Sequence, residues 1–178
     1  MRTLAWICAM FLISSTLALA QSDQRPYAGH ERSAIHPLSA QEAQELLTGQ
    51  SMGLADVAER HHYPGPKPVL DLVSQLHLSE MQRAATQKIY DHMHAEAVLL
   101  GRLIVDKERD LDRLLAKDDL DSTTLDRMIR DIAKLRGELR AIHLQGHVET
   151  TQLLSPEQIQ KMRSCEETRP VNDPLLCP

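Results

Sequence analysis

The sequence predicts an all-α protein whose main feature is a long antiparallel α-hairpin with short flanking helices. Aromatic residues make up only 3% of the 178 residues, too few for the sandwich and barrel cores that depend on aromatic and β-branched side chains. Two long segments instead repeat apolar residues at helical spacing. The turn between them is short, which makes consecutive helices antiparallel neighbours. Because two helices bury little apolar surface by themselves, we expect a homodimer.

Residues 1–20 have the pattern of a signal peptide. Arg2 precedes an apolar run over residues 4–13, and Ala18-Leu19-Ala20 is a small-x-small cleavage site. The apolar run is too short for a comfortable membrane span, so cleavage is favoured over the alternative of an uncleaved N-terminal anchor. The sequence therefore predicts export to the periplasm, with no integral membrane segment after cleavage.

Short helices are expected between a flexible segment, residues 21–38, and the hairpin. Ser39 and Glu42 form a capping box that predicts a helix to about Thr48. A second short helix begins at Ser51 and must end before the Pro-Gly-Pro sequence at 64–66. A third helix is predicted over residues 69–76, with Pro68 in its first turn. The helical domain as a whole is expected to span residues 39–165.

The hairpin is predicted by two long segments without proline. Ser79 and Gln82 form a second capping box, and an apolar stripe continues from there to about Lys117. Residues 117–121 form the turn, and the next helix, capped at Asp121 or Ser122, runs to residue 153. Three methionines on these stripes are expected in the core: Met81, Met93 and Met128. The first segment also carries apolar residues outside its stripe, expected at a dimer interface or a client surface: Val98, Leu99, Leu103 and Val105.

A last helix begins after Ser155, with Pro156 in its first position. Residues 166–178 contain proline and asparagine and are expected to form an irregular tail. Of the three cysteines, Cys8 leaves with the signal peptide. In an oxidising compartment, Cys165 and Cys177 either form a disulfide or stay reduced, and their spacing does not decide between these alternatives.

The two main helix starts resemble the paired L-T-x-x-Q motifs of the Spy/CpxP periplasmic family. They read Leu78-Ser79-Glu80-Met81-Gln82 and Leu154-Ser155-Pro156-Glu157-Gln158. Serine replaces threonine at both sites, which preserves the capping hydroxyl. The resemblance covers roughly residues 66–165 and extends to ZraP-like zinc-associated proteins and CnrX-like heavy-metal sensors. It implies a cradle-shaped, often dimeric protein that acts as an ATP-independent chaperone, an envelope-stress modulator, or a metal sensor or binder.

Four side chains form the candidate metal site of the sequence: His92, Glu96, His143 and His147. Each helix contributes two of them at a spacing of four residues, which places the pair on one helix face. With the turn centred near residue 120, His92 is level with His147 and Glu96 with His143. Imidazole and carboxylate ligands suit Zn²⁺, Cu²⁺, Ni²⁺ or Co²⁺. CnrX-like sensors similarly use a helix glutamate with a His-x-x-x-Met pair, whereas here the second residue of that pair is histidine.

The level of these residues is predicted, but not the direction in which they point. The alternative is a set of solvated histidines, with His92 and Glu96 paired within their own helix. His94 is expected to point elsewhere on the helix, and His77 to be structural. Two further groups could add a ligand, although the first is better explained as a helix end: His61 with His62, and His30 with His36.

Charge and motif content exclude other classes of function. The net charge is −5, with acidic and basic residues interspersed, which disfavours a nucleic-acid surface. No nucleophile elbow and no H-E-x-x-H sequence is present, so an enzyme is not expected. The leading hypothesis is a periplasmic stress protein of Spy/CpxP type that requires no cofactor and binds unfolded proteins or a membrane sensor protein. The alternative is a periplasmic heavy-metal sensor or metal-binding resistance protein.

Overall fold

All regular elements that the structure describes are helices, which confirms the all-α prediction. The computed structural model describes residues 38–117 and 120–168, with side chains as far as residue 165. Within these ranges lie the helices α1 (Ala40–Leu47), α2 (Asp56–Arg60), α3 (Pro66–Asp71), α4 (Glu80–Ala116), α5 (Ser122–Leu153) and α6 (Pro156–Thr168). None of these described helices combines the length and the apolar character needed to cross a membrane. The predicted signal peptide, His30 and His36 lie outside the described residues.

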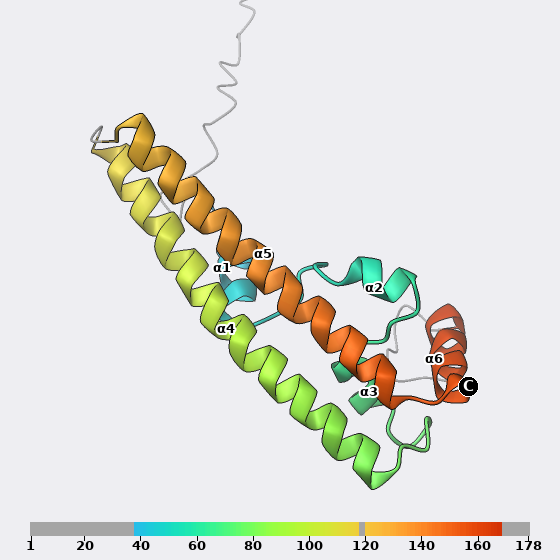
Figure 1. Ribbon diagram of the computed structural model, residues 1–178. Helices are drawn as coiled ribbons and strands as arrows, with labels where there is room; N and C mark the ends of the chain where they lie inside the picture. The colour runs from blue at the N-terminus through green and yellow to red at the C-terminus, as the bar shows by residue number, and fades with distance from the viewer. Residues whose placement is uncertain (1–37, 118–119, 169–178) are drawn as a thin grey trace, which may run out of the picture. The chain divides into compact units, whose positions relative to one another are not determined.

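Helices α4 and α5 lie side by side and form the predicted hairpin (Figure 1). At the start of α4, the backbone N–H of Gln82 donates to the Ser79 hydroxyl, and the Gln82 side chain accepts from the Ser79 N–H. At the start of α5, the Asp121 carboxylate accepts from the N–H groups of Thr123 and Thr124 at 2.8 and 2.9 Å. These caps satisfy backbone donors that a helix leaves unpaired at its first turn.

The glutamines of the two capping boxes also bind each other. Gln82 Nε2 donates to Gln158 Oε1 at 2.8 Å and to the carbonyl of Leu153 at 2.8 Å. Gln158 Nε2 donates to Gln82 Oε1 and to the carbonyl of Leu76, both at 3.2 Å. We call this pair the glutamine clasp. It joins the start of α4 to the start of α6, so the two similar motifs contact each other.

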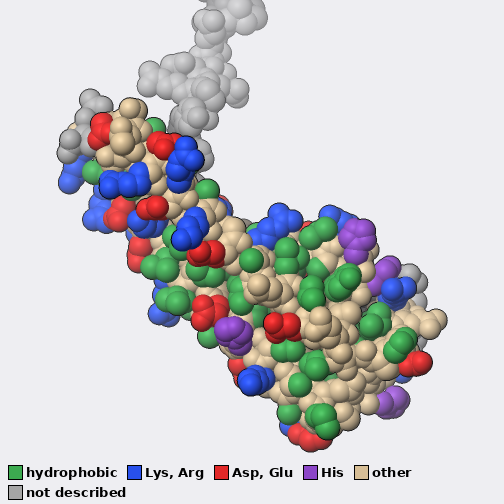
Figure 2. Space-filling view, viewed as in Figure 1, with side chains coloured by type: hydrophobic (Ala, Val, Ile, Leu, Met, Phe, Trp, Pro, Cys, Tyr) green, Lys and Arg blue, Asp and Glu red, His purple; other side chains and the backbone are tan. Residues whose placement is uncertain are grey.

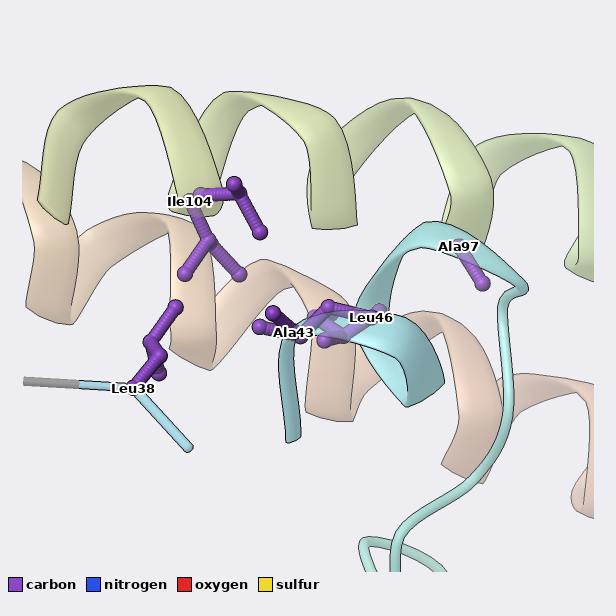
Figure 3. Close-up of a cluster of buried hydrophobic side chains, with 7 residues drawn as sticks. Leu38, Ala43, Leu46, Ala97 and Ile104 are labelled. Atoms are coloured by element: carbon purple, nitrogen blue, oxygen red, sulfur yellow. The ribbon is translucent and has the colours of Figure 1, made fainter. Parts of the chain in front are cut away.

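Helix α1 packs against α4 at close range because residue 101 is a glycine. A Cβ atom at Gly101 would lie 2.0 Å from the carbonyl oxygen of Leu46, so any side chain there would overlap the backbone of α1. The contact belongs to a buried cluster, drawn in Figure 3: Leu38, Ala43, Leu46, Ala97, Ile104, Val105 and Leu139. Arg136 adds ion pairs to Glu42 of α1 and to Glu108 of α4.

A second buried cluster connects α3 and the segment after it with α6. It consists of Val69, Leu72, Leu76, Leu154, Met162 and Cys165. Cys165 is 2% exposed and disulfide-bonded, whereas Cys177, its partner in one of the two alternatives considered for it, lies outside the described residues. The cluster anchors α6 next to the glutamine clasp.

Several sequence predictions need correction. Helix α2 begins at Asp56 rather than near Ser51, because Met52 and Gly53 have φ values of 46° and 73°, which a right-handed helix does not accept. The third helix spans Pro66–Asp71 rather than 69–76, so the chain turns where a helix was expected to continue.

Two apolar positions also differ from expectation. Met81 is 81% exposed, although Met93 and Met128 are buried as predicted. Val105, which was expected at a dimer interface or client surface, is buried in the cluster beneath α1. Leu99 and Leu103 do remain exposed. The apolar stripe of α4 alone could not predict that α1 packs over part of this helix, because α1 belongs to a different segment of the chain.

Candidate functional site

The two histidines of α5 point into the protein. His143 is 1% exposed and His147 is 5% exposed, because both lie on the face of α5 that packs against the rest of the domain. The Nδ1 atom of His147 lies 2.8 Å from the backbone carbonyl oxygen of Tyr63, in the connection between α2 and α3. A carbonyl only accepts hydrogen bonds, so Nδ1 carries the hydrogen and donates it.

Helix α4 contributes His94 rather than His92. His94 is half-buried, and its Nε2 lies 3.1 Å from the carbonyl oxygen of Thr48, to which it donates. Its ring stacks on Tyr90, with the ring centroids 5.6 Å apart. His92 is exposed, and Glu96 is half-buried. His94 therefore points elsewhere on the helix than His92, as expected, and its ring contacts the segment that follows α1.

A cavity of about 390 Å³ opens between the hairpin and the segments that lead to α2 and α3. Side chains of differing chemistry line it, including the imidazoles of His94 and His143, the thioether of Met93 and the carboxylate of Glu59. The remaining lining residues are Thr48, Gly49, Gln50, Ser51, Pro66, Lys67, Pro68 and Tyr90. The structure thus brings one histidine from each arm of the hairpin to the same cavity.

His143 is the unusual side chain of this cavity. Its Nε2 atom is buried and has no hydrogen-bond partner among the described residues. Burial lowers the pKa of the imidazole, and repulsion from His147 and His94 lowers it further. The ring is therefore neutral at pH 7. A buried polar atom without a partner costs free energy, and such atoms are rare in native proteins, so this atom calls for an explanation.

The donor set suits a borderline transition metal. Neutral imidazole nitrogen binds Zn²⁺, Cu²⁺, Ni²⁺ and Co²⁺, and a thioether adds a softer ligand. The predicted ligands His92, Glu96, His143 and His147 do not form one cluster, and the described part of the chain contains no group of three or more His, Cys, Asp or Glu side chains that could hold a metal ion. The cavity therefore offers two imidazoles, those of His94 and His143, but the described residues do not complete a metal-ligand set around them.

The remaining histidines have other surroundings. His61 and His62 are exposed beyond the end of α2, in agreement with the helix-end interpretation. His62 and His77 have positive φ values of 64° and 49°. Met93 packs on Gly146 of α5, but His92 and His94 both adjoin Met93 in the sequence, so no sequence signal singles out His94.

The fold and this site define a helical-hairpin protein with a cavity that His94 and His143 help to line, called the histidine-lined cavity below. The model of the heavy-metal resistance family matches residues 46–161, so the chain belongs to that family. The match includes every residue that lines the cavity. This family covers the CnrX-like and ZraP-like group of the resemblance described above. Neither a curated protein nor a solved structure matches the chain.

Proposed function

We propose that this protein binds a divalent transition metal in the histidine-lined cavity, as a periplasmic heavy-metal sensor or metal-binding resistance protein without enzymatic activity. The observation that carries the proposal is the buried Nε2 of His143, which has no hydrogen-bond partner among the described residues. A bound metal would give that nitrogen a partner. Membership of the heavy-metal resistance family supports the same conclusion.

The chain's own residues prepare the imidazoles for this role. Burial keeps His143 neutral, so its lone pair is available for a metal. His94 donates from Nε2 to the Thr48 carbonyl, which leaves the lone pair of its neutral ring on Nδ1. The bound metal would act as a Lewis acid that joins ligands from both arms of the hairpin.

Calorimetric titration of the chain lacking residues 1–20 with Zn²⁺, Cu²⁺, Ni²⁺ and Co²⁺ tests this proposal. We expect His143→Ala and His94→Ala each to weaken binding by at least about tenfold, because each removes an imidazole at the cavity. His92→Ala is the matched control, because this exposed histidine lies only two residues from His94. The control should bind like the unaltered protein.

Two results would contradict the proposal. The first is the absence of any binding tighter than about millimolar in the unaltered protein. The second is binding that persists in the variant lacking both His94 and His143. If His92→Ala weakens binding as strongly as His94→Ala, the ligands include the residues predicted from their level along the hairpin. The cavity is then not the site.

A second candidate function is the ATP-independent binding of unfolded polypeptide. A groove of about 400 Å³ between α2 and α5 favours it, because its lining is mostly apolar: Val57, Ala58, His61, Tyr63, Leu144 and Val148. We expect the protein to suppress aggregation of an unfolding client at equimolar concentration, and Val148→Asp to reduce this effect by placing a charge in the groove. Glu149→Ala, at the next exposed position, is the control. Unchanged client aggregation with the unaltered protein would remove this candidate.

A further inference from the structure

A further cavity lies between the two arms of the hairpin near the turn, and we call it the tip cleft. Its volume of about 510 Å³ falls within the range of small-molecule sites, about 300–1,000 Å³. Charged side chains supply most of its lining, and two apolar side chains and a threonine supply the rest: Lys107, Asp110, Arg113, Leu114, Lys117, Thr124, Arg127, Met128 and Asp131. None of these residues lines the histidine-lined cavity.

The positive charges of the tip cleft outnumber its negative charges. Lys107 Nζ lies 3.0 Å from the carboxylate of Asp131, and Arg113 pairs with Asp110. These pairs use both carboxylates of the lining, which contains two further cations. The cleft therefore keeps two positive charges that its own residues do not neutralise, in a chain whose net charge is −5.

The two remaining cations are Lys117 and Arg127. Both are exposed, and neither has an ion-pair partner among the described residues. Lys117 directly follows α4, and Arg127 lies in the second turn of α5, so they reach the cleft from opposite arms. Asp121, the described acid nearest to Lys117 in the sequence, already accepts from the backbone at the start of α5, and Asp118 and Asp119 lie outside the described residues.

Apolar side chains lie beside these cations. Met128 is 8% exposed and Leu114 is half-buried, and both pack in the buried cluster of the hairpin tip. A wall of low dielectric beside a cation strengthens the attraction of the cation for an anion. It also offers contact to the carbon atoms of an anionic molecule.

We propose that the tip cleft binds the phosphate group of a small molecule or a lipid headgroup between Lys117 and Arg127. A phosphate monoester carries a charge of about −1.5 to −2 at pH 7, which matches the two cations, whereas a single carboxylate would leave one of them without a partner. The guanidinium donates two parallel hydrogen bonds to phosphate oxygens, and the ammonium adds a point charge. This site shares no residue with the proposed metal site, so either can exist without the other.

Nuclear magnetic resonance titration of the protein with glycerol 3-phosphate tests the inference. We expect a Kd of about 1 mM or tighter, and weaker binding as the NaCl concentration is raised. Lys117→Gln and Arg127→Gln should each weaken binding about tenfold, because each removes a charge-assisted hydrogen bond. Arg130→Gln is the matched control, because it removes the same charge from a residue that pairs with Asp126 and does not line the cleft. Glycerate, the corresponding carboxylate, should bind more weakly than glycerol 3-phosphate.

Vesicles distinguish the two sources of the phosphate group. Binding to phosphatidylcholine vesicles only when they contain phosphatidic acid, with loss of binding in Arg127→Gln, assigns the cleft to a lipid headgroup. Binding of glycerol 3-phosphate without vesicle binding assigns it to a soluble phosphorylated molecule. Two results would overturn the inference. One is binding of neither probe, which is expected if Asp118 and Asp119 neutralise Lys117. The other is an equal loss in Arg127→Gln and Arg130→Gln, which indicates a general effect of charge.

Discussion

The two ends of the hairpin are built differently, although the same two helices form both. At the tip, residues 106–132, α4 and α5 pack on each other around the small cluster of Leu111, Met128 and Ile132. At the base, residues 79–105 and 133–154, helices α1 and α3 add a further layer. Charged side chains crowd the tip in Figure 2, whereas hydrophobic side chains are more frequent toward the base. Among the described residues, the buried histidines lie at the base.

The difference shows where a two-helix hairpin can hold buried polar chemistry. A pair of helices leaves most of its surface in water, so tip side chains form exposed ion pairs such as Asp126 with Arg130. The added layer at the base removes water from His143 and His147 and lowers the pKa of His143. The short helices therefore matter for the proposed metal site because they create the environment of the imidazoles, even though they supply few of the candidate ligands.

A substitution at the contact between α1 and α4 should cause the largest loss of stability. Gly101→Ala places a Cβ atom 2.0 Å from the Leu46 carbonyl, and neither backbone can yield without moving a helix. We expect a loss of about 3 kcal/mol in the free energy of unfolding, measured by urea denaturation followed by circular dichroism.

The matched control for this prediction is Gly137→Ala, at an exposed position of α5 where no atom lies within 4 Å of a Cβ. Removing a glycine from a helix interior should raise stability there by about 0.5–1 kcal/mol. If both variants change stability in the same direction, the close approach of α1 to Gly101 is not what determines the loss.

Removal of the glutamine clasp should cause the next largest loss of stability. Gln158→Ala removes bonds to Gln82, to the Leu76 carbonyl and to its own capping box. Because these groups are partly buried, we expect a loss of about 1–2 kcal/mol in the free energy of unfolding, measured in urea. Gln87→Ala, which removes only an exposed bond to Asp91, is the control. Equal losses would show that the clasp adds nothing beyond a surface hydrogen bond.

Much of this fold could be predicted from local sequence. The capping boxes at Ser79 and Ser155 and the long stripes set the starts of α4 and α6 and the hairpin itself, because caps and periodicity act within one helix. The bounds of α2 and α3 could not be predicted in this way. They depend on left-handed residues at 52 and 53 and on tertiary burial of Leu72 and Leu76.

The level of the candidate site along the hairpin could be predicted from the sequence, but the direction in which its side chains point could not. Counting from the turn placed the histidines of the two arms at one level, and both α5 histidines do face inward. The same count cannot decide between His92 and His94, because it gives the level of a residue along the hairpin and not its direction. Residues two positions apart on a helix point in nearly opposite directions. The connection that covers His147 was also hidden from the sequence, because Tyr63 and Gly65 are more than eighty positions away from it.

Acidification should lower the free energy of unfolding through His143 at the base of the hairpin. This loss should develop more gradually than the loss caused by removing the clasp. Burial lowers the pKa of His143 below its usual value of 6.5, so the unfolded chain binds a proton more readily than the folded protein. The free energy of unfolding should be highest above pH 6.5 and fall as the pH drops through that value. His143→Gln should flatten this fall in urea titrations between pH 8 and pH 5. A fall that is equally flattened by His92→Gln, at an exposed position, would not originate from the buried ring.

The tip should show the smallest effect. Asp126 and Arg130 pair at 2.8 Å, but their side chains are 62% and 77% exposed, so water and salt screen the attraction. A double-mutant cycle with Asp126→Asn and Arg130→Gln should give a coupling energy of at most about 0.5 kcal/mol, reduced further in 1 M NaCl. If the coupling exceeds about 1 kcal/mol and resists salt, the tip charges are organised more tightly than exposed pairs. The tip and the base would then differ in the type of interaction that they contain, but not in the strength of those interactions.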